Sequence, residues 1–180
     1  MFRNLIAVIL GTAVLTVSGA SAQSPSAQMK AAEDTSRLKL APLTWMVGEW
    51  TGPANGSSGG QTFSVMQHEK VVLAASGTVL LIQGQGTMNG NPVFQAAGLI
   101  SFDMGSHQFK WVSSGGTGYL GISEAEVRGD TLVWFTPGAG GSRTRYTIWK
   151  SAKGEWREIG EMSRDNGSWT RTFEMTLVTK

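Results

Sequence analysis

Cysteine is absent from the 180-residue sequence, and histidine occurs only as His68 and His107. The first absence excludes disulfides, thiolate-bound zinc, iron–sulfur clusters and cysteine nucleophiles. The second excludes a three-histidine or HExxH metal site built from one chain. Fifteen basic and 13 acidic residues leave a formal net charge of only +2. The composition therefore predicts no metal site and no nucleic-acid partner.

Glycine and aromatic residues are plentiful in comparison. The chain has 24 Gly, seven Trp and seven Phe, and 41% of its residues are hydrophobic. The apolar content supplies a core, and the glycines supply many tight turns. A length of 180 residues fits one domain. We expect a single turn-rich β domain.

The first 22 residues have the pattern of a signal peptide. One positive charge at Arg3 precedes an apolar run over 5–10, and Ala20-Ser21-Ala22 forms an A-x-A cleavage site. Polar and small residues interrupt the run, which is shorter than the roughly 20 apolar residues that a membrane span needs. We expect cleavage after residue 22. The mature protein would then be soluble in the periplasm or secreted, with no membrane span after leader removal.

Residues 23–42 differ from the rest, since Ser, Ala, Gln and Lys dominate there. They favour a short helix over 27–37 or a disordered polar tether equally, with Ser26 as the helix cap in the first case. Residues 43–180 form the third region, which we predict to be the β domain.

From Trp45 onward, apolar and polar residues alternate with a period of two, and turn residues recur about every ten positions. This spacing predicts an antiparallel meander. Closure removes exposed sheet edges, and short connections favour an up-and-down barrel of about 8 to 10 strands over a sandwich. Turns are predicted at Asn89-Gly90, Gly129-Asp130 and Lys153-Gly154. The candidate strands cover 46–52, 61–68, 77–88, 93–102, 107–114, 118–127, 131–136, 143–150, 155–163 and 168–178.

The last predicted strand has one apolar face, formed by Trp169, Phe173, Met175 and Leu177 together with Arg171. A cation on an inward face needs an aromatic ring, backbone carbonyls or an anion beside it. In the strand over 143–150, we place Tyr146 inside and the arginines outside, because three buried cations would be too costly.

The segment Leu43-Thr-Trp-Met-Val-Gly-Glu-Trp-Thr-Gly52 resembles the opening of calycin-type barrels. In that group a short helical turn closes the barrel base, and a G-x-W motif, here Gly48-Glu49-Trp50, begins the first strand. The resemblance extends to bacterial lipocalin-like domains of unknown function and, more distantly, to nitrobindin-like barrels. In lipocalins the motif Trp packs beneath a cation of the last strand, which implies that Trp50 and Arg171 stack.

Haem is not expected, although nitrobindin-like proteins bind it. Their haem histidine lies near the C-terminal end of the barrel, and no histidine follows His107 here. No cofactor is therefore predicted.

Catalytic motifs are also lacking. His68-Glu69-Lys70 is predicted to be a solvated turn at the end of a strand, since neighbouring strand residues point to opposite faces. No serine can be assigned both a histidine and an acid, so no catalytic residue is predicted. Enzyme activity stays undecided and is the less favoured reading.

The sequence favours an exported binding protein that holds a small, largely apolar ligand in a barrel cavity. One alternative is a structural or partner-binding barrel with a packed interior. Another is a barrel enzyme such as an isomerase, with Glu49, Tyr119 or Tyr146 as its polar group. The sequence indicates neither the ligand nor the oligomeric state. The residues predicted to contact the ligand are Trp111, Tyr146, Phe173, Met175 and Leu177.

Overall fold

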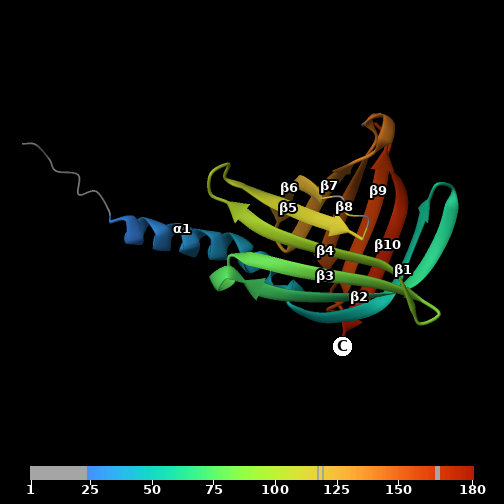
Figure 1. Ribbon diagram of the computed structural model, residues 1–180, viewed down its shortest axis with the longest axis horizontal. Helices are drawn as coiled ribbons and strands as arrows, with labels where there is room; N and C mark the ends of the chain where they lie inside the picture. The colour runs from blue at the N-terminus through green and yellow to red at the C-terminus, as the bar shows by residue number, and fades with distance from the viewer. Residues whose placement is uncertain (1–23, 117, 119, 165–166) are drawn as a thin grey trace, which may run out of the picture.

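Ten antiparallel strands close into one barrel, as Figure 1 shows. The computed structural model describes residues 24–116, 118, 120–164 and 167–180. Each strand pairs with its neighbours in the chain, and β1 also pairs with β10 to close the ring. The prediction of an up-and-down barrel with a helical turn at its N-terminal base is confirmed. The signal-peptide prediction for residues 1–22 lies outside the described residues.

The strand bounds follow the predicted order closely. They are β1 Gly48–Ser58, β2 Gln61–Ala74, β3 Val79–Met88, β4 Asn91–Asp103, β5 Gln108–Gly115, β6 Leu120–Arg128, β7 Thr131–Pro137, β8 Arg143–Lys150, β9 Trp156–Ser163 and β10 Thr170–Thr179. The strand β1 continues past its predicted end to a hairpin turn at Gly59-Gly60, where both residues have positive φ, and β2 begins at 61 as predicted but continues to Ala74. Such turns favour glycine, which has no Cβ to clash in that region.

The helix α1, Pro25–Leu40, precedes the barrel, so of the two alternatives for 23–42 the structure has the helix. Its N-cap is Ser24, whose Oγ accepts a hydrogen bond from the backbone N–H of Ala27 at 3.3 Å. Ser26, the predicted cap, lies inside the helix. No helix in the described ranges combines the length and apolar character that a membrane crossing requires.

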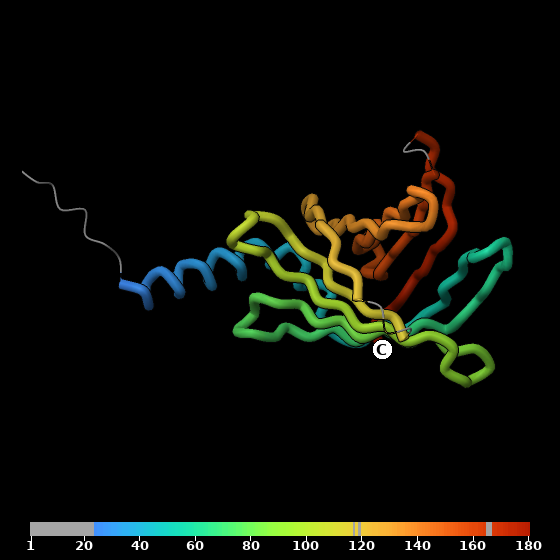
Figure 2. Tube along the Cα trace, turned by 45° about the horizontal axis from the view of Figure 1, so that its top comes forward, coloured from blue at the N-terminus to red at the C-terminus, as the bar shows by residue number. Residues whose placement is uncertain are grey.

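One end of the barrel carries α1 and the 3-10 helix η1, Ala41–Met46, as both views show (Figures 1 and 2). The Arg37 guanidinium donates to the backbone carbonyl of Ser76 at 3.1 Å, and Leu40, Leu43 and Met46 are fully buried. The tips of the β1–β2 and β3–β4 hairpins lie at the other end. This arrangement closes the base and leaves the far end for a cavity mouth.

Three tryptophans pack together at the closed base. Trp50 contacts Trp45 and Trp156 edge to face, with ring centroids 6.0 and 5.9 Å apart. The indole N–H of Trp50 donates to the backbone carbonyl of Met46 at 2.8 Å. The two tryptophans of the sequence motif thus join η1 to the barrel. The last residue of this motif, Gly52, must be glycine because an added Cβ would lie 2.1 Å from the carbonyl oxygen of Thr176.

The predicted stacking of Arg171 on Trp50 is wrong. Trp50 pairs with Thr179 in β10, eight residues beyond Arg171, which is about 26 Å along a strand. A β-bulge between Arg171 and Phe173 breaks the alternation, so Phe173 faces in and Arg171 faces out. The Arg171 side chain is 57% exposed and lies 3.6 Å from the carboxylate of Glu174.

The predicted orientation of β8 is confirmed. Tyr146 lines the interior, whereas Arg145 donates to Glu161 at 2.8 Å and lies 4.4 Å from the centroid of the Trp169 ring. The second arginine of this strand, Arg143, also lies over Trp169. The basic side chains of β8 are therefore held on the outer surface.

Candidate functional site

The barrel encloses a cavity of about 660 Å³. Its wall is built by inward-facing residues of the strands and is mainly apolar, with seven aromatic side chains. The aromatic residues are Phe63, Phe94, Trp111, Trp134, Tyr146, Trp156 and Phe173. Near the β1–β2 and β3–β4 hairpins, the lining residues Phe63, Met88, Val93 and Phe94 are partly exposed. These four residues form the mouth of the cavity.

Four of the five predicted ligand contacts lie in the cavity wall: Trp111, Tyr146, Phe173 and Met175. The fifth, Leu177, is fully buried and pairs with Trp156 toward the base, so it belongs to the core below the cavity. The proposed role of these residues in ligand binding stays a prediction.

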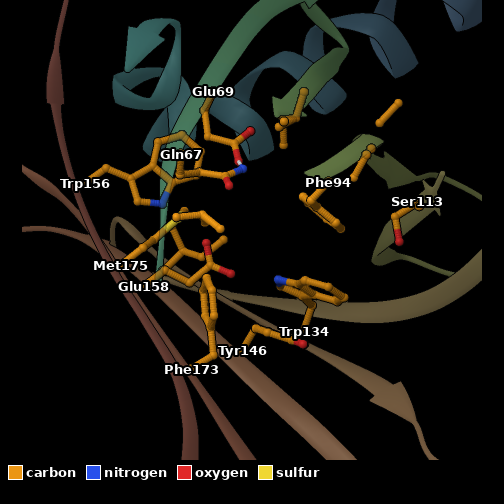
Figure 3. Close-up of a pocket in the computed structure, with 18 of the residues that line it drawn as sticks. Gln67, Glu69, Phe94, Ser113, Trp134, Tyr146, Trp156, Glu158, Phe173 and Met175 are labelled. Atoms are coloured by element: carbon orange, nitrogen blue, oxygen red, sulfur yellow. Dashed lines mark hydrogen bonds between the residues drawn. The ribbon is translucent and has the colours of Figure 1, made fainter. Parts of the chain in front are cut away.

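A stack of aromatic rings forms one wall, and Figure 3 labels two of its members, Trp134 and Tyr146. Trp134 lies between Trp111 and Tyr146, with ring centroids 4.5 and 4.4 Å away and planes nearly parallel. Trp111 and Trp134 come from β5 and β7, and they meet across β6 because their partners on that strand are the small residues Ser123 and Ala125.

Glycines in the strands make room for these large side chains. A Cβ at Gly98 would lie 3.2 Å from Trp111, and one at Gly160 would lie 2.9 Å from Tyr146 and 3.0 Å from the Cβ of Phe173. Gly84 lies beneath Glu69 in the same way, since an added Cβ would stand 2.8 Å from its Oε1. In these places an added side chain would displace residues that line the cavity.

Two carboxyl groups reach the cavity, Glu69 from β2 and Glu158 from β9 (Figure 3). The side-chain amide of Gln67 donates to Oε1 of Glu69 at 2.7 Å, while the buried Oε2 has no hydrogen-bond partner. Glu158 is 8% exposed. The carboxyl pair, meaning Glu69 and Glu158, is therefore the main polar feature of an otherwise apolar wall.

Burial changes the acidity of both groups. It raises the pKa of Glu69 to about 7, and the hydrogen bond from Gln67 offsets part of this rise. Burial, followed by the nearby charge of Glu69, raises the pKa of Glu158 to about 8. The nearby indole N–H of Trp156 partly offsets the rise in the pKa of Glu158. The geometry between this N–H and the carboxyl group is not that of a hydrogen bond. Burial and then the charge of Glu158 also raise the pKa of Tyr146.

The prediction that His68-Glu69-Lys70 forms a solvated turn is wrong. Strand β2 continues to Ala74, and the alternation along it turns Glu69 inward and His68 outward. The signal was present in the sequence, because Val65 and the buried Val71 share the parity of Glu69.

Sequence reasoning also missed Glu158 as a site residue. It shares the inward face of β9 with Trp156 and Gly160. The other polar groups proposed from sequence lie elsewhere: Glu49 is exposed near Lys70, and Tyr119 is outside the described residues. Among the described residues, no group of three or more potential His, Asp or Glu ligands is placed to hold a metal ion.

A closed antiparallel barrel with an interior cavity has the architecture of a lipocalin-like barrel. Comparison with solved structures agrees with this class. The S-type phycobiliprotein lyase CpeS from Guillardia theta is 11% identical with a TM-score of 0.57, covering 82% of this chain and 96% of its own. Rv2717c from M. tuberculosis is 14% identical with a TM-score of 0.54, covering 81% and 97%.

These likenesses concern the fold alone. No known protein-family profile matches the sequence, and no curated protein matches it.

Proposed function

We propose that this chain is an exported protein that binds a small, largely apolar molecule in its barrel cavity. The observation that carries the proposal is the cavity of about 660 Å³ with its aromatic and aliphatic wall. Pockets that bury drug-sized ligands begin at roughly 300 Å³ and are mostly apolar. The export part of the proposal rests on the signal-peptide pattern of residues 1–22 and places the protein in the periplasm or outside the cell.

The size of the cavity weighs against the packed structural barrel considered from sequence. A packed interior would leave few voids larger than a water molecule. The similar fold of a phycobiliprotein lyase supports only the barrel architecture in this proposal. At 11% identity the likeness does not indicate which ligand this chain binds.

Native mass spectrometry of the protein purified from its host tests the proposal without assuming a ligand class. Retained ligand is expected as an added mass that denaturation removes. Tryptophan emission then reports titrations with neutral probes such as 2-naphthalenemethanol, since Trp111, Trp134 and Trp156 line the cavity. Saturable quenching is expected.

A pair of neighbouring substitutions in β5 provides the control. Ser113 lines the cavity, and the adjacent Ser114 does not. Ser113→Phe should fill space in the cavity and weaken probe binding at least about tenfold, whereas Ser114→Phe should leave binding within about twofold. Equal effects of both substitutions, or no binding of any neutral probe, would refute the cavity as a binding site.

The carboxyl pair in the cavity wall favours a second candidate function, a barrel enzyme. A carboxyl group whose pKa lies near neutrality can give or take a proton at working pH, as general acid–base catalysis requires. Mass spectrometry of a recovered ligand after incubation with the native protein and with Glu158→Gln separates the two functions. Conversion by the native protein alone would indicate catalysis, and an unchanged ligand in both would indicate binding.

A further inference from the structure

We propose that the ligand carries a protonated amine, which the Glu69 and Glu158 carboxyls bind together inside the cavity. This inference rests on the proposed binding function and assigns the chemical class of its ligand. Two observations carry it: the charges in the cavity wall, and the Glu69 carboxyl oxygen left without a protein partner.

The charges in the wall are of one sign. Glu69 and Glu158 are the ionisable acids among the described lining residues, and Tyr146 is the remaining titratable group facing them. No lysine, arginine or histidine occurs among the described residues that line the cavity. The adjacent Lys70 and Arg157 alternate to the outer face of their strands. The protein thus presents one buried acid, Glu158, and one half-buried acid, Glu69, to a space where its own side chains supply no cation.

Three polar atoms of residues in the cavity wall lack hydrogen-bond partners in the protein. Oε2 of Glu69 accepts no hydrogen bond, and the indole N–H groups of Trp111 and Trp134 donate none. Trp111 is 7% and Trp134 is 9% exposed. Figure 3 shows the Trp134 nitrogen turned toward the side where Glu158 and Tyr146 lie. Buried polar atoms are normally paired, so Oε2 of Glu69 indicates contact with a hydrogen-bond donor of a bound molecule, whereas the two indole N–H groups call for an acceptor, which an ammonium group does not supply.

An ammonium group fits the carboxyl pair better than a neutral or anionic group does. It supplies the missing positive charge together with three hydrogen-bond donors. Its attraction to a carboxylate is strengthened where water is excluded. The apolar wall of the cavity accommodates the apolar remainder of the ligand. A carboxylate ligand would instead meet two acids, so fatty acids are expected to bind poorly.

Proton release would accompany amine binding. Glu69 and Glu158 hold protons near neutral pH because burial without a cation raises their pKa values. A bound ammonium favours the ionised carboxyl and lowers both pKa values. Affinity for an amine should therefore increase as pH increases from about 5.5 to 8. Affinity for a neutral analogue should change little over that range.

Three naphthalene derivatives of matched shape test the inference by calorimetry at pH 7: 2-naphthylmethylamine, 2-naphthalenemethanol and 2-naphthoate. The amine is expected to bind at least about tenfold more tightly than the alcohol, and the naphthoate more weakly than either. Repeating the amine titration in buffers of different ionisation enthalpy should show net proton release. This measurement uses the native chain and needs no variant.

The variants assign the effect to the carboxyl pair. Glu69→Gln and Glu158→Gln, alone and combined, should reduce the preference for the amine, and the double variant should bring it within about twofold of the alcohol. Binding of the alcohol should change less than about threefold. Glu124→Gln is the matched control, because Glu124 is 71% exposed on β6, and it should alter none of these values.

The outcomes separate the two proposals. Tight binding of the alcohol with no preference for the amine and no proton release would overturn the amine inference and leave the binding function intact. An amine preference that persists in the double variant would overturn the assignment to Glu69 and Glu158. Failure of all three compounds and of every neutral probe would overturn the proposed function itself.

Discussion

Glu69 and Gly84 are direct partners across β2 and β3, and the Glu69 carboxyl lies on the glycine backbone where a side chain would otherwise stand. A Cβ at position 84 would lie 2.8 Å from Oε1 of Glu69 and 3.2 Å from the amide nitrogen of Gln67. The glycine therefore holds the place in which Gln67 donates to Glu69. The position of one half of the carboxyl pair depends on the absence of a side chain opposite it.

Gly84→Ala should displace the Glu69 carboxyl while leaving the fold intact. The atoms in conflict are the ends of flexible side chains, so we expect the free energy of unfolding to change by less than about 1 kcal/mol. The preference for 2-naphthylmethylamine over the alcohol should fall at least about threefold. Gly121→Ala is the control, since Gly121 does not line the cavity and an added Cβ there would lie 3.9 Å from its nearest atoms. An unchanged preference in Gly84→Ala would contradict this role.

The free energy of unfolding should decrease as pH increases from 5 to 9. A carboxyl with a raised folded pKa contributes stability that is fully present below its unfolded value of 4.5 and lost as pH rises through about 8 for Glu158. Glu158→Gln keeps this position neutral and should remove about 2 to 4 kcal/mol of the decrease. Urea unfolding of the native protein, Glu158→Gln and the exposed control Glu124→Gln at pH 5.5, 7 and 9 measures it. Parallel pH profiles in all three proteins would show that Glu158 is not buried as described.

Gly160→Ala should destabilise the aromatic wall. The new Cβ would lie 2.9 Å from Tyr146 and 3.0 Å from the Cβ of Phe173, an atom fixed to the β10 backbone. Overpacking of this kind costs about 1 to 3 kcal/mol. Gly121→Ala, in β6, serves as the matched control because its nearest atoms would be 3.9 Å away. In thermal denaturation, Gly160→Ala should clearly lower the melting temperature, and Gly121→Ala should leave it almost unchanged.

The two arginines of the outer surface should differ sharply on substitution. Arg171→Ala should change the free energy of unfolding by less than about 0.5 kcal/mol, because the side chain is exposed and its ion pair with Glu174 is long. Arg145→Ala should cost about 1 to 2 kcal/mol, since it removes the 2.8 Å contact with Glu161 and the stacking on Trp169. Chemical denaturation of both variants checks this order. If Arg171→Ala lowered the free energy of unfolding more than Arg145→Ala does, the result would contradict this order and favour the stacking of Arg171 on Trp50 that was expected from the sequence.

Much of the fold could be predicted because its signals are local. The turn at Asn89-Gly90 follows from positive φ at both residues, and strand alternation follows from the pleat. The same alternation placed Tyr146 inside and the β8 arginines outside. The lipocalin resemblance failed for Arg171, since a β-bulge of one residue reverses the faces of a strand and leaves no clear sign in the sequence.

The apolar residues of the candidate site could be predicted from the sequence, and its carboxyl groups could not. Trp111, Tyr146, Phe173 and Met175 were found because apolar residues on an inward face are expected to line the interior. Glu69 was assigned to a solvated turn, since charged residues are rarely buried and the end of β2 was placed too early. Its inward direction was set by the continuation of β2 to Ala74.

By itself, the sequence determined the antiparallel order of about 8 to 10 strands and the aromatic content of the interior, because these depend on residue periodicity and turn chemistry, whereas the helical base was expected only from the resemblance to calycin-type barrels. Only the tertiary structure decided that Glu69 and Glu158 share one cavity. They are 89 positions apart in the chain, and closure of β1 onto β10 brings β2 and β9 around the same space. Their raised pKa values have the same origin, since the burial of both carboxyls, and the charge of Glu69 that further raises the pKa of Glu158, arise only when the barrel closes.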